Sequence, residues 1–156
     1  MRKIFLIFVL IASVAIFSSC KKDSNGNVVI PSMSAKINLT DWSALVRTAT
    51  ITGNTLSVNG SSLGGEIIQL TVTPANSATL TTNVTYDISI TSFYKKSLSA
   101  GIDDTYFAVT GSVKLTQLDM TNKLISGTFS FNASSTSFGL AAITNGEFTN
   151  ISFTAL

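Results

Sequence analysis

Residues 124–133 read LISGTFSFNA, a stretch in which two kinds of residue alternate. Ile125, Gly127, Phe129 and Phe131 occupy every second position, with polar residues between them. Successive side chains of a β-strand point to opposite faces of a sheet. A period of two therefore predicts a strand with one buried face and one solvent-facing side.

The residues before this stretch continue the same pattern. Tyr106–Leu118 is predicted to form one long or bent strand, with Gly111 at a bulge because glycine inside a strand often marks one. Polar residues at 119–123 predict a turn into the strand that follows. The segment 106–133 is thus expected to form a pair of long antiparallel strands.

Two further strands are expected after it, over Phe138–Thr144 and Glu147–Thr154. The dipeptide Asn145-Gly146 lies between them. This dipeptide is a strong signal for a two-residue β-hairpin, because both residues tolerate positive φ. We therefore expect the chain to reverse direction at Asn145-Gly146.

The N-terminal half alternates in shorter sets, at 33–39, 42–46, 56–58, 68–72 and 86–90. No window of eleven or more residues after residue 20 has the 3.6-residue stripe of a helix. The sequence predicts an all-β, antiparallel sandwich of about nine strands in a single domain over 33–156. A closed or partly open up-and-down barrel fits the same periodicity.

Composition limits the chemistry of this domain. The chain of 156 residues contains no histidine and one cysteine. Zinc sites are built mostly from Cys and His, and Ser-His-Asp catalysis needs an imidazole, so both are excluded. A single cysteine also excludes a disulfide within the chain. We expect no metal and no cofactor.

The first nineteen residues have the pattern of a secretory signal peptide. Arg2 and Lys3 precede an apolar run over residues 4–17. Fourteen residues in a helix span only about 21 Å, too short for a hydrocarbon core of ~30 Å. Residues 1–19 are therefore predicted to direct export and to be removed.

The lone cysteine follows this segment directly. Ser18-Ser19-Cys20 resembles the lipobox of bacterial lipoproteins, in which a diacylglycerol is attached to the cysteine sulfur and the peptide is cut before it. Residues 20–32, rich in polar and turn-forming residues, then form a flexible tether from the lipidated Cys20 to the domain. The expected partner at this end is membrane lipid.

Removal of the signal peptide changes the charge balance. The net charge of +2 comes from Arg2 and Lys3, and residues 20–156 carry eight basic and eight acidic side chains. A nucleic-acid-binding protein needs a basic surface to neutralise phosphates. We therefore expect no nucleic-acid partner.

Several segments resemble a family of uncharacterised lipoproteins of Bacteroidota-type bacteria. The similar segments, in order, are Ala35–Asn38, Asp41–Ala44, Val113–Asp119, Asn122–Phe131 and Ile143–Phe148. The resemblance implies an exported, lipid-anchored protein with a β-sandwich domain of unknown function, and it carries over no catalytic residue. Members often have Gly after the residue equivalent to Asn38, where this chain has Leu39, so the first hairpin is expected to turn differently.

Two patterns of catalytic residues were weighed against simpler explanations. Ser92 and Lys95 have the Ser-x-x-Lys spacing of penicillin-binding enzymes, but residues three apart in a strand point to opposite faces. Glu66 and Glu147 are the only glutamates, and a glycosidase needs two carboxyl groups about 5–9 Å apart. A carboxylate-based glycoside hydrolase is the least favoured alternative.

Acidic residues could also supply oxygen ligands to a calcium ion. Asp103 and Asp104 are adjacent in the sequence, and Asp87 could join them. The spacing of an EF-hand loop is absent, and consecutive acidic residues in a loop are usually only solvated. We therefore predict no metal site.

A possible ligand surface is predicted at Phe93, Tyr94, Lys95 and Lys96. They lie in the longest segment without a strand signal, residues 92–104, and binding residues often collect in such loops. Aromatic rings beside ammonium groups suit a glycan or an envelope protein. Trp42 lies in an alternating set and is expected in the core.

These observations predict a lipid-anchored module of the cell envelope, held at the outer membrane, that acts by binding and not by catalysis. A purely structural envelope lipoprotein is the first alternative. The ligand or partner is left open between a glycan and an envelope protein.

Overall fold

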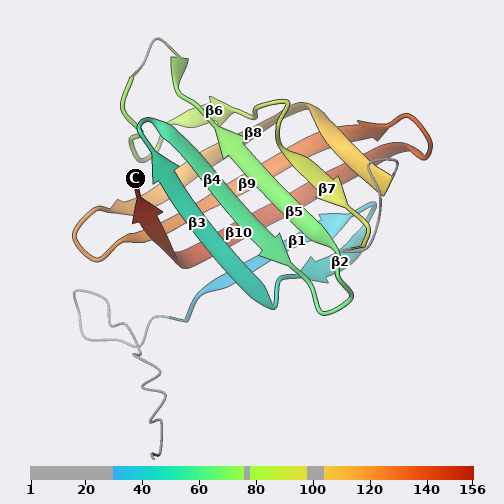
Figure 1. Ribbon diagram of the computed structural model, residues 1–156, viewed down its shortest axis with the longest axis horizontal. Coiled ribbons are helices and arrows are strands. Elements are labelled where there is room, and N and C mark those ends of the chain that lie inside the picture. Colours follow the sequence, from blue (N-terminus) through green and yellow to red (C-terminus); the bar gives the residue numbers. More distant parts are fainter. Residues whose placement is uncertain (1–29, 76–77, 98–103) are drawn as a thin grey trace, which may run out of the picture.

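The computed structural model describes residues 30–75, 78–97 and 104–156 (Figure 1). Within these ranges the regular structure is β, in agreement with the predicted fold class. The strands are β1 Ser32–Ile37, β2 Thr40–Ser43, β3 Val46–Thr52, β4 Thr55–Ser61, β5 Ile67–Val72, β6 Thr85–Asp87, β7 Phe93–Lys95, β8 Thr105–Asp119, β9 Leu124–Ser135 and β10 Gly139–Ala155.

The structure does not test the predictions made for the N-terminal segment. The signal peptide, Cys20 and the tether up to residue 29 lie outside the described residues. None of the residues that the structure describes forms a helix long and apolar enough to cross a membrane.

The ten strands form one sheet. Its pairings close a ring in the order β3–β4–β5–β7–β8–β9–β10, and β10 returns to β3. β1 and β2 extend the sheet from β10, and β6 pairs with β8. All pairs are antiparallel except β10 with β3, which is parallel.

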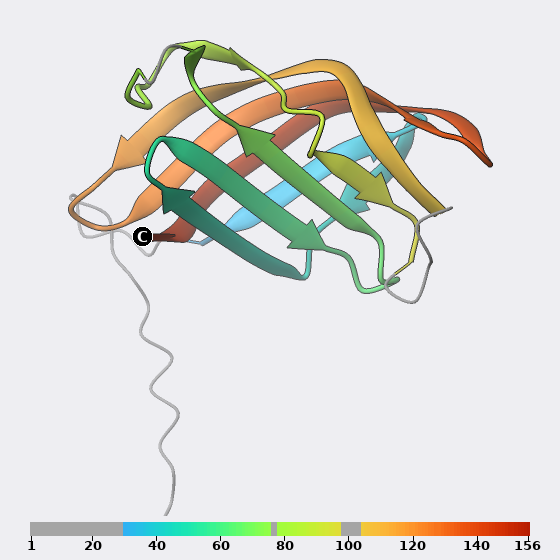
Figure 2. The same cartoon turned by 45° about the horizontal axis from the view of Figure 1, so that its top comes forward.

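The sheet folds into two layers. Figure 2 shows β3, β4, β5 and β7 crossing over the longer strands β8, β9 and β10. Hydrogen bonds join the layers at both sides, between β7 and β8 and between β10 and β3. The predicted layered β domain is present, with ten strands in place of about nine.

Apolar side chains fill the space between the layers. The largest fully buried side chains include Phe148, Met33, Leu56 and Ile68, and Trp42 is in the core as predicted. Packing is close enough to require glycine at Gly60, where an added Cβ would lie 2.9 Å from the Trp42 ring. The interior of the ring is therefore a packed core.

The predicted hairpin at Asn145-Gly146 is wrong. β10 runs without a reversal from Gly139 to Ala155, and its pairing with β9 shifts register between Ile143 and Gly146. Asn145 has φ 51°, but Gly146 does not adopt the positive φ that a type I′ turn requires at both residues. The dipeptide makes a bulge that bends β10, and the chain reverses earlier, between β9 and β10.

The pair β8–β9 matches its prediction more closely. β8 ends at Asp119 and β9 begins at Leu124, so the turn at 119–123 is confirmed. The predicted bulge is present, but the register shifts between Ala108 and Thr110, just before Gly111.

The first hairpin has a two-residue turn. Asn38 and Leu39 join β1 to β2 with φ values of 48° and 73°, the positive pair of a type I′ turn. Leu39 thus takes a positive φ where glycine would be unstrained, directly beside the pairing of Ile37 with Thr40. Whether family members turn differently stays a prediction.

The turns between strands gather at two opposite ends of the domain, which we call the entry end and the far end. At the entry end the chain reaches β1, and the β3–β4 and β8–β9 turns lie there too (Figure 1). At the far end lie the Asn38-Leu39 turn, the β9–β10 turn and the end of β7 (Figure 1). Ser32 pairs with Thr149 of β10, whereas the far end of that strand starts at Gly139. At ~3.3 Å per residue the two ends are about 30 Å apart.

Candidate functional site

The predicted ligand residues lie on and just after β7. Phe93 and Lys95 are half-buried, Tyr94 between them is 4% exposed, and Lys96 beyond them is exposed. The expectation of a loop is therefore wrong for residues 93–95, and the pleat turns Tyr94 inward. The four residues are neighbours in the fold, but they do not form one surface.

Phe93 belongs to a row of side chains that crosses four strands. It pairs with Phe107, which pairs with Ser134, which in turn pairs with Leu140. Phe107 is 42% exposed, Leu140 is 78% exposed, and Val109 further along β8 is 60% exposed. We call Phe93, Phe107, Val109 and Leu140 the apolar strip. With strands ~4.8 Å apart, it is about 14 Å long.

The two aromatic rings of the strip contact each other edge to face. The centroids of Phe93 and Phe107 are 6.4 Å apart and their planes make an angle of 64°. This is a favourable arrangement for two phenyl rings, because the positive edge of one meets the negative face of the other. The pair is therefore ordered before any partner arrives.

Lys96 lies at the far end, against the rings of Phe138 and the buried Tyr106. Its Nζ atom is 4.7 Å from the Phe138 ring centroid and 5.2 Å from that of Tyr106. An ammonium over the face of an aromatic ring is attracted by the ring quadrupole. Phe138, half exposed, and Lys96 thus add a positively charged corner to the far end.

Tyr94 contacts the interior instead of the strip. Its hydroxyl donates a hydrogen bond of 2.9 Å to Glu66 Oε1, and the Ser62 hydroxyl donates to Glu66 Oε2 at 3.3 Å. Burial, together with the bond to the Glu66 carboxylate, raises the pKa of Tyr94 well above its usual value. Tyr94 is a structural residue that holds β5 to β7.

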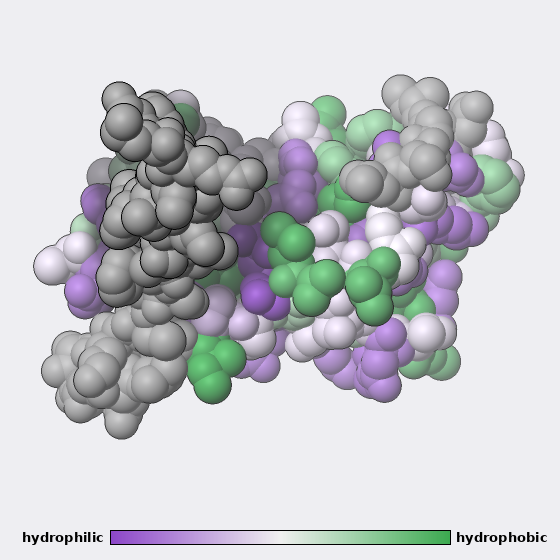
Figure 3. Space-filling view, turned by 60° about the horizontal axis from the view of Figure 1, so that its bottom comes forward, coloured by the Kyte–Doolittle hydropathy of each residue, from purple (hydrophilic) through white to green (hydrophobic). Residues whose placement is uncertain are grey.

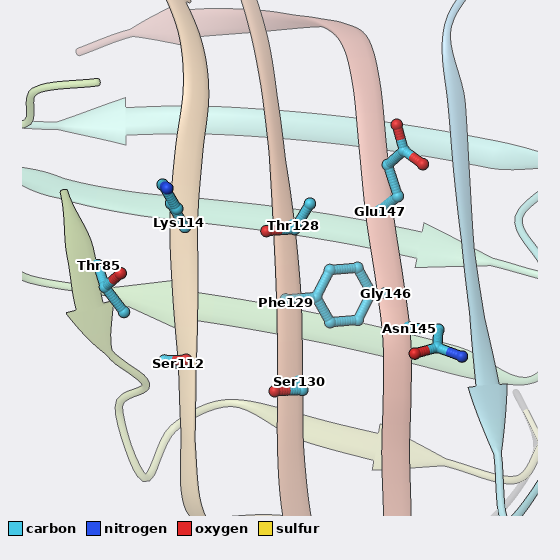
Figure 4. A pocket seen from close by; sticks show the side chains of 9 residues that line it. All are labelled: Thr85, Ser112, Lys114, Thr128, Phe129, Ser130, Asn145, Gly146 and Glu147. Atoms are coloured by element: carbon cyan, nitrogen blue, oxygen red, sulfur yellow. The ribbon is translucent and has the colours of Figure 1, made fainter. Parts of the chain in front are cut away.

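An open depression lies elsewhere, on β6, β8, β9 and β10 (Figure 4). It measures about 540 Å³, and Lys114, Thr128 and Glu147 cross it as partners on adjacent strands. Hydroxyl and amide side chains make up most of the rest: Thr85, Ser112, Ser130 and Asn145. It is an open polar surface and not an enclosed cavity.

The two glutamates do not share a cleft. Glu147 lines this depression, whereas Glu66 lines a separate one of about 340 Å³ beside β2. A glycosidase needs both carboxyl groups around one bond of the substrate. The arrangement of Glu66 and Glu147 does not provide that.

The Ser92 side chain makes hydrogen bonds to the backbone of Thr71. Its hydroxyl accepts a bond of 2.8 Å from the Thr71 N–H and donates one of 3.2 Å to the Thr71 carbonyl. The side chain is fully buried. Ser92 therefore joins the loop before β7 to β5, which explains the Ser-x-x-Lys spacing without catalysis.

Asp87, Asp103 and Asp104 are the acidic residues that were considered, and not favoured, as calcium ligands. Asp103 lies outside the described residues, Asp87 ends β6, and Asp104 precedes β8. Across the three described ranges, no group of three or more His, Cys, Asp or Glu side chains could hold a metal ion.

Sequence reasoning missed most of the apolar strip. A signal was present in Tyr106-Phe107-Ala108-Val109, four apolar residues in a row inside a strand that otherwise alternates. Such a run places apolar side chains on both faces of the strand. One face packs inside, and the other must meet solvent or a partner.

Comparison with known proteins identifies one family. Its model, described as a domain of unknown function, matches residues 20–152. No curated protein matches the chain, and no solved structure matches it either.

Proposed function

The chain belongs to this family, DUF6252, and we propose that it is a non-catalytic binding module of the cell envelope. In this proposal lipid on Cys20 anchors the protein in the outer membrane, and the apolar strip binds an envelope protein. The exposed apolar strip is the observation that carries the proposal.

Exposure of the strip is unusual for its residue types. Phe, Val and Leu are normally buried, yet Phe107, Val109 and Leu140 are 42%, 60% and 78% exposed on β8 and β10, the two strands that flank β9. Single exposed apolar residues need no explanation, but a contiguous set points to an interaction site. Aromatic anchors at the centre of such a set are typical of residues that dominate binding energy.

The shape of the strip favours a protein over a glycan. A sugar ring stacks on one flat aromatic face, whereas the edge-to-face angle of 64° between Phe93 and Phe107 leaves no shared plane. Val109 and Leu140 add aliphatic surface, and Ser134 is the only hydroxyl in the cross-strand row. Apolar side chains with few polar groups resemble the core of a protein–protein interface.

The direction of the chain supports an exposed position for the strip. β1 begins at the entry end, whereas β10 starts at the far end with Gly139 and Leu140 (Figure 1). If residues 20–29 behave as the flexible tether that the sequence predicts, these ten residues reach about 17 Å. A domain held in this way can present its far end about 30 Å further from the bilayer. The family match also begins at Cys20, the predicted first residue of the mature chain.

A non-catalytic role is supported by the state of the candidate residues. Glu66 and Glu147 line different depressions, and the Ser92 hydroxyl is bonded to Thr71 on both sides. What this face offers a partner is its shape and its apolar side chains, not a reacting group.

Site-specific photo-crosslinking in intact cells tests this proposal. A photoreactive residue in place of Leu140 should give one discrete adduct with another envelope protein, and Val109→Asp in the same chain should abolish it. A probe at Thr128, exposed on β9 outside the strip, is the matched control and should give none. An unchanged pattern in the Val109→Asp chain, or an adduct with polysaccharide alone, would contradict the proposal.

A further inference from the structure

The strand β2 is an end of the sheet. Its four residues pair with β1, and the order of strands begins with β2. Its neighbour Ala44 donates its N–H to the carbonyl of Met33, so alternate residues of this segment face β1. By the alternation of an antiparallel ladder, the backbone N–H and C=O of Asp41 and Ser43 point away from β1.

A groove lies beside this free edge. It measures about 340 Å³ and lies between residues 41–45 and the β4–β5 loop, from which Ser62, Leu63, Gly64 and Glu66 line it. Leu45 is 60% exposed on one side and Leu63 is 87% exposed on the other. Figure 3 shows exposed hydrophobic residues among polar ones on this side of the molecule, which Figure 1 draws at the bottom.

A buried polar group at the groove lacks a partner. Trp42 lines the groove and is 4% exposed, and its Nε1–H makes no hydrogen bond within the described part of the chain. A buried donor without an acceptor costs free energy, so nearly all such groups are paired in folded proteins.

The charge of the groove is acidic. Asp41 and Glu66 line it, and none of the residues lining it is basic. The Glu66 carboxylate accepts bonds from Tyr94 and Ser62, and its two oxygens retain acceptor capacity. The Asp41 carboxylate is already paired with Lys36 at 2.6 Å. Glu66 is thus the carboxylate best placed for a cation on a ligand.

We propose that this groove binds an extended peptide segment that adds to β2 as a further strand and places a Lys or Arg side chain at Glu66. The backbone groups of Asp41 and Ser43, which have no hydrogen-bond partner among the described residues, would supply the main-chain hydrogen bonds, and the two leucines would contact apolar side chains of the segment. A second copy of this chain fits less well, because pairing β2 with β2 would bring two Asp41-bearing edges together.

Two blocked pentapeptides test the proposal on the full-length chain in detergent micelles. One is acetyl-Thr-Val-Lys-Val-Thr-amide, and the other has Glu in place of Lys. The Lys peptide should bind at least about tenfold more tightly, which corresponds to ~1.4 kcal/mol. Trp42 is the only tryptophan, so its single indole N–H resonance reports binding directly and should shift.

Variants separate the backbone and charge contributions. Ser43→Pro removes an outward N–H without touching the ladder to β1 and should weaken both peptides about tenfold, whereas Ser43→Ala should not. Glu66→Gln keeps an acceptor for Tyr94 but should abolish the preference for Lys, and it tests the proposal even if Ser43→Pro does not fold. Leu140→Asp in the apolar strip should leave peptide binding unchanged.

Three results would overturn the proposal. The first is an indole resonance that neither peptide moves at millimolar concentration. The second is equal affinity for the Lys and Glu peptides. The third is self-association that Ser43→Pro abolishes, which would identify a second copy as the occupant. None of them bears on the apolar strip, so the two proposals fail separately.

Discussion

Leu39 holds a backbone conformation that suits glycine. Its φ of 73° belongs to the left-handed region, where an L side chain costs ~1–2 kcal/mol. The side chain is 84% exposed, so its removal loses little packing.

Leu39→Gly should therefore stabilise the domain, by about 1 kcal/mol after allowance for the extra freedom of glycine in the unfolded chain. Thermal unfolding should show a melting temperature higher by a few degrees. Asn38→Gly is the control, because Asn already tolerates this region and its Oδ1 accepts a bond from the Ala142 N–H. A lower melting temperature for Leu39→Gly would contradict the turn geometry.

Tyr94 couples stability to alkaline pH. Its pKa is raised in the folded protein by burial and by the hydrogen bond to Glu66. As the pH rises above ~10, the unfolded chain loses the phenol proton while the folded protein retains it. The stability that this residue contributes is thus complete below that pH and declines above it.

Tyr94→Phe should lower the free energy of unfolding near neutral pH by about 1 kcal/mol through loss of the bond to Glu66. The wild-type protein should lose stability above pH ~10 as the Tyr94 contribution disappears, whereas the variant lacks that contribution at every pH. The difference in free energy of unfolding between the two proteins should therefore narrow from pH ~10 upward. Urea unfolding at pH 7 and pH 11 measures both effects. The same difference in free energy of unfolding at both pH values would show that Tyr94 does not link stability to pH.

At the scale of the element, β10 bends because of its residues at 145 and 146. Asn145 takes positive φ at the bulge, and Gly146 leaves room for the ring of Phe129, which an added Cβ would approach to 2.5 Å. Phe129 is buried in the core and has little space to retreat.

Gly146→Ala should destabilise the domain by ~1–3 kcal/mol, the usual cost of overpacking a core. Gly64→Ala is the matched control, because an added Cβ there would meet only the Ser62 hydroxyl oxygen at 3.7 Å. Chemical denaturation of the two variants measures the difference. Equal stabilities would mean that β10 can shift to accommodate the methyl group.

The same element shows the limit of local signals. Residues 124–133 predicted β9, and the strand extends over Leu124–Ser135. Asn145-Gly146 was an equally clear local signal for a hairpin turn. The pairing of β10 with both β1 and β9 nevertheless holds the chain extended there. Positive φ at one residue serves a bulge as well as a turn, and only the neighbouring strands decide between them.

At the scale of the whole molecule, the proposed lipid anchor on Cys20, outside the described ranges, predicts that one residue holds the domain at the membrane. Cys20→Ser should move the protein from the membrane fraction to the soluble fraction, because the acyl chains, each worth ~0.8 kcal/mol per buried CH₂, would be lost. Fractionation of cells with immunodetection measures this. Membrane retention equal to that of the wild type would exclude the lipid anchor.

The candidate site was predictable only in part. Phe93 and Lys96 belong to the four residues predicted as a ligand surface because they lie in a segment without a strand signal. Phe107, Val109 and Leu140 join Phe93 through pairings between strands far apart in sequence. Tyr94 turns inward because β7 inserts between β5 and β8. A loop was expected there, since three residues are too few to show a period of two.

The sequence by itself determined the β class, the turn at 119–123 and the burial of Trp42, because alternation and turn chemistry are local properties of the chain. Tertiary structure alone decided that seven of the ten described strands close into one ring and that Glu66 and Glu147 lie in separate depressions. It also decided that four apolar side chains share one strip. The reason is physical. A strand's period fixes which side chains share a face, but the pairing partner and its register fix which faces meet.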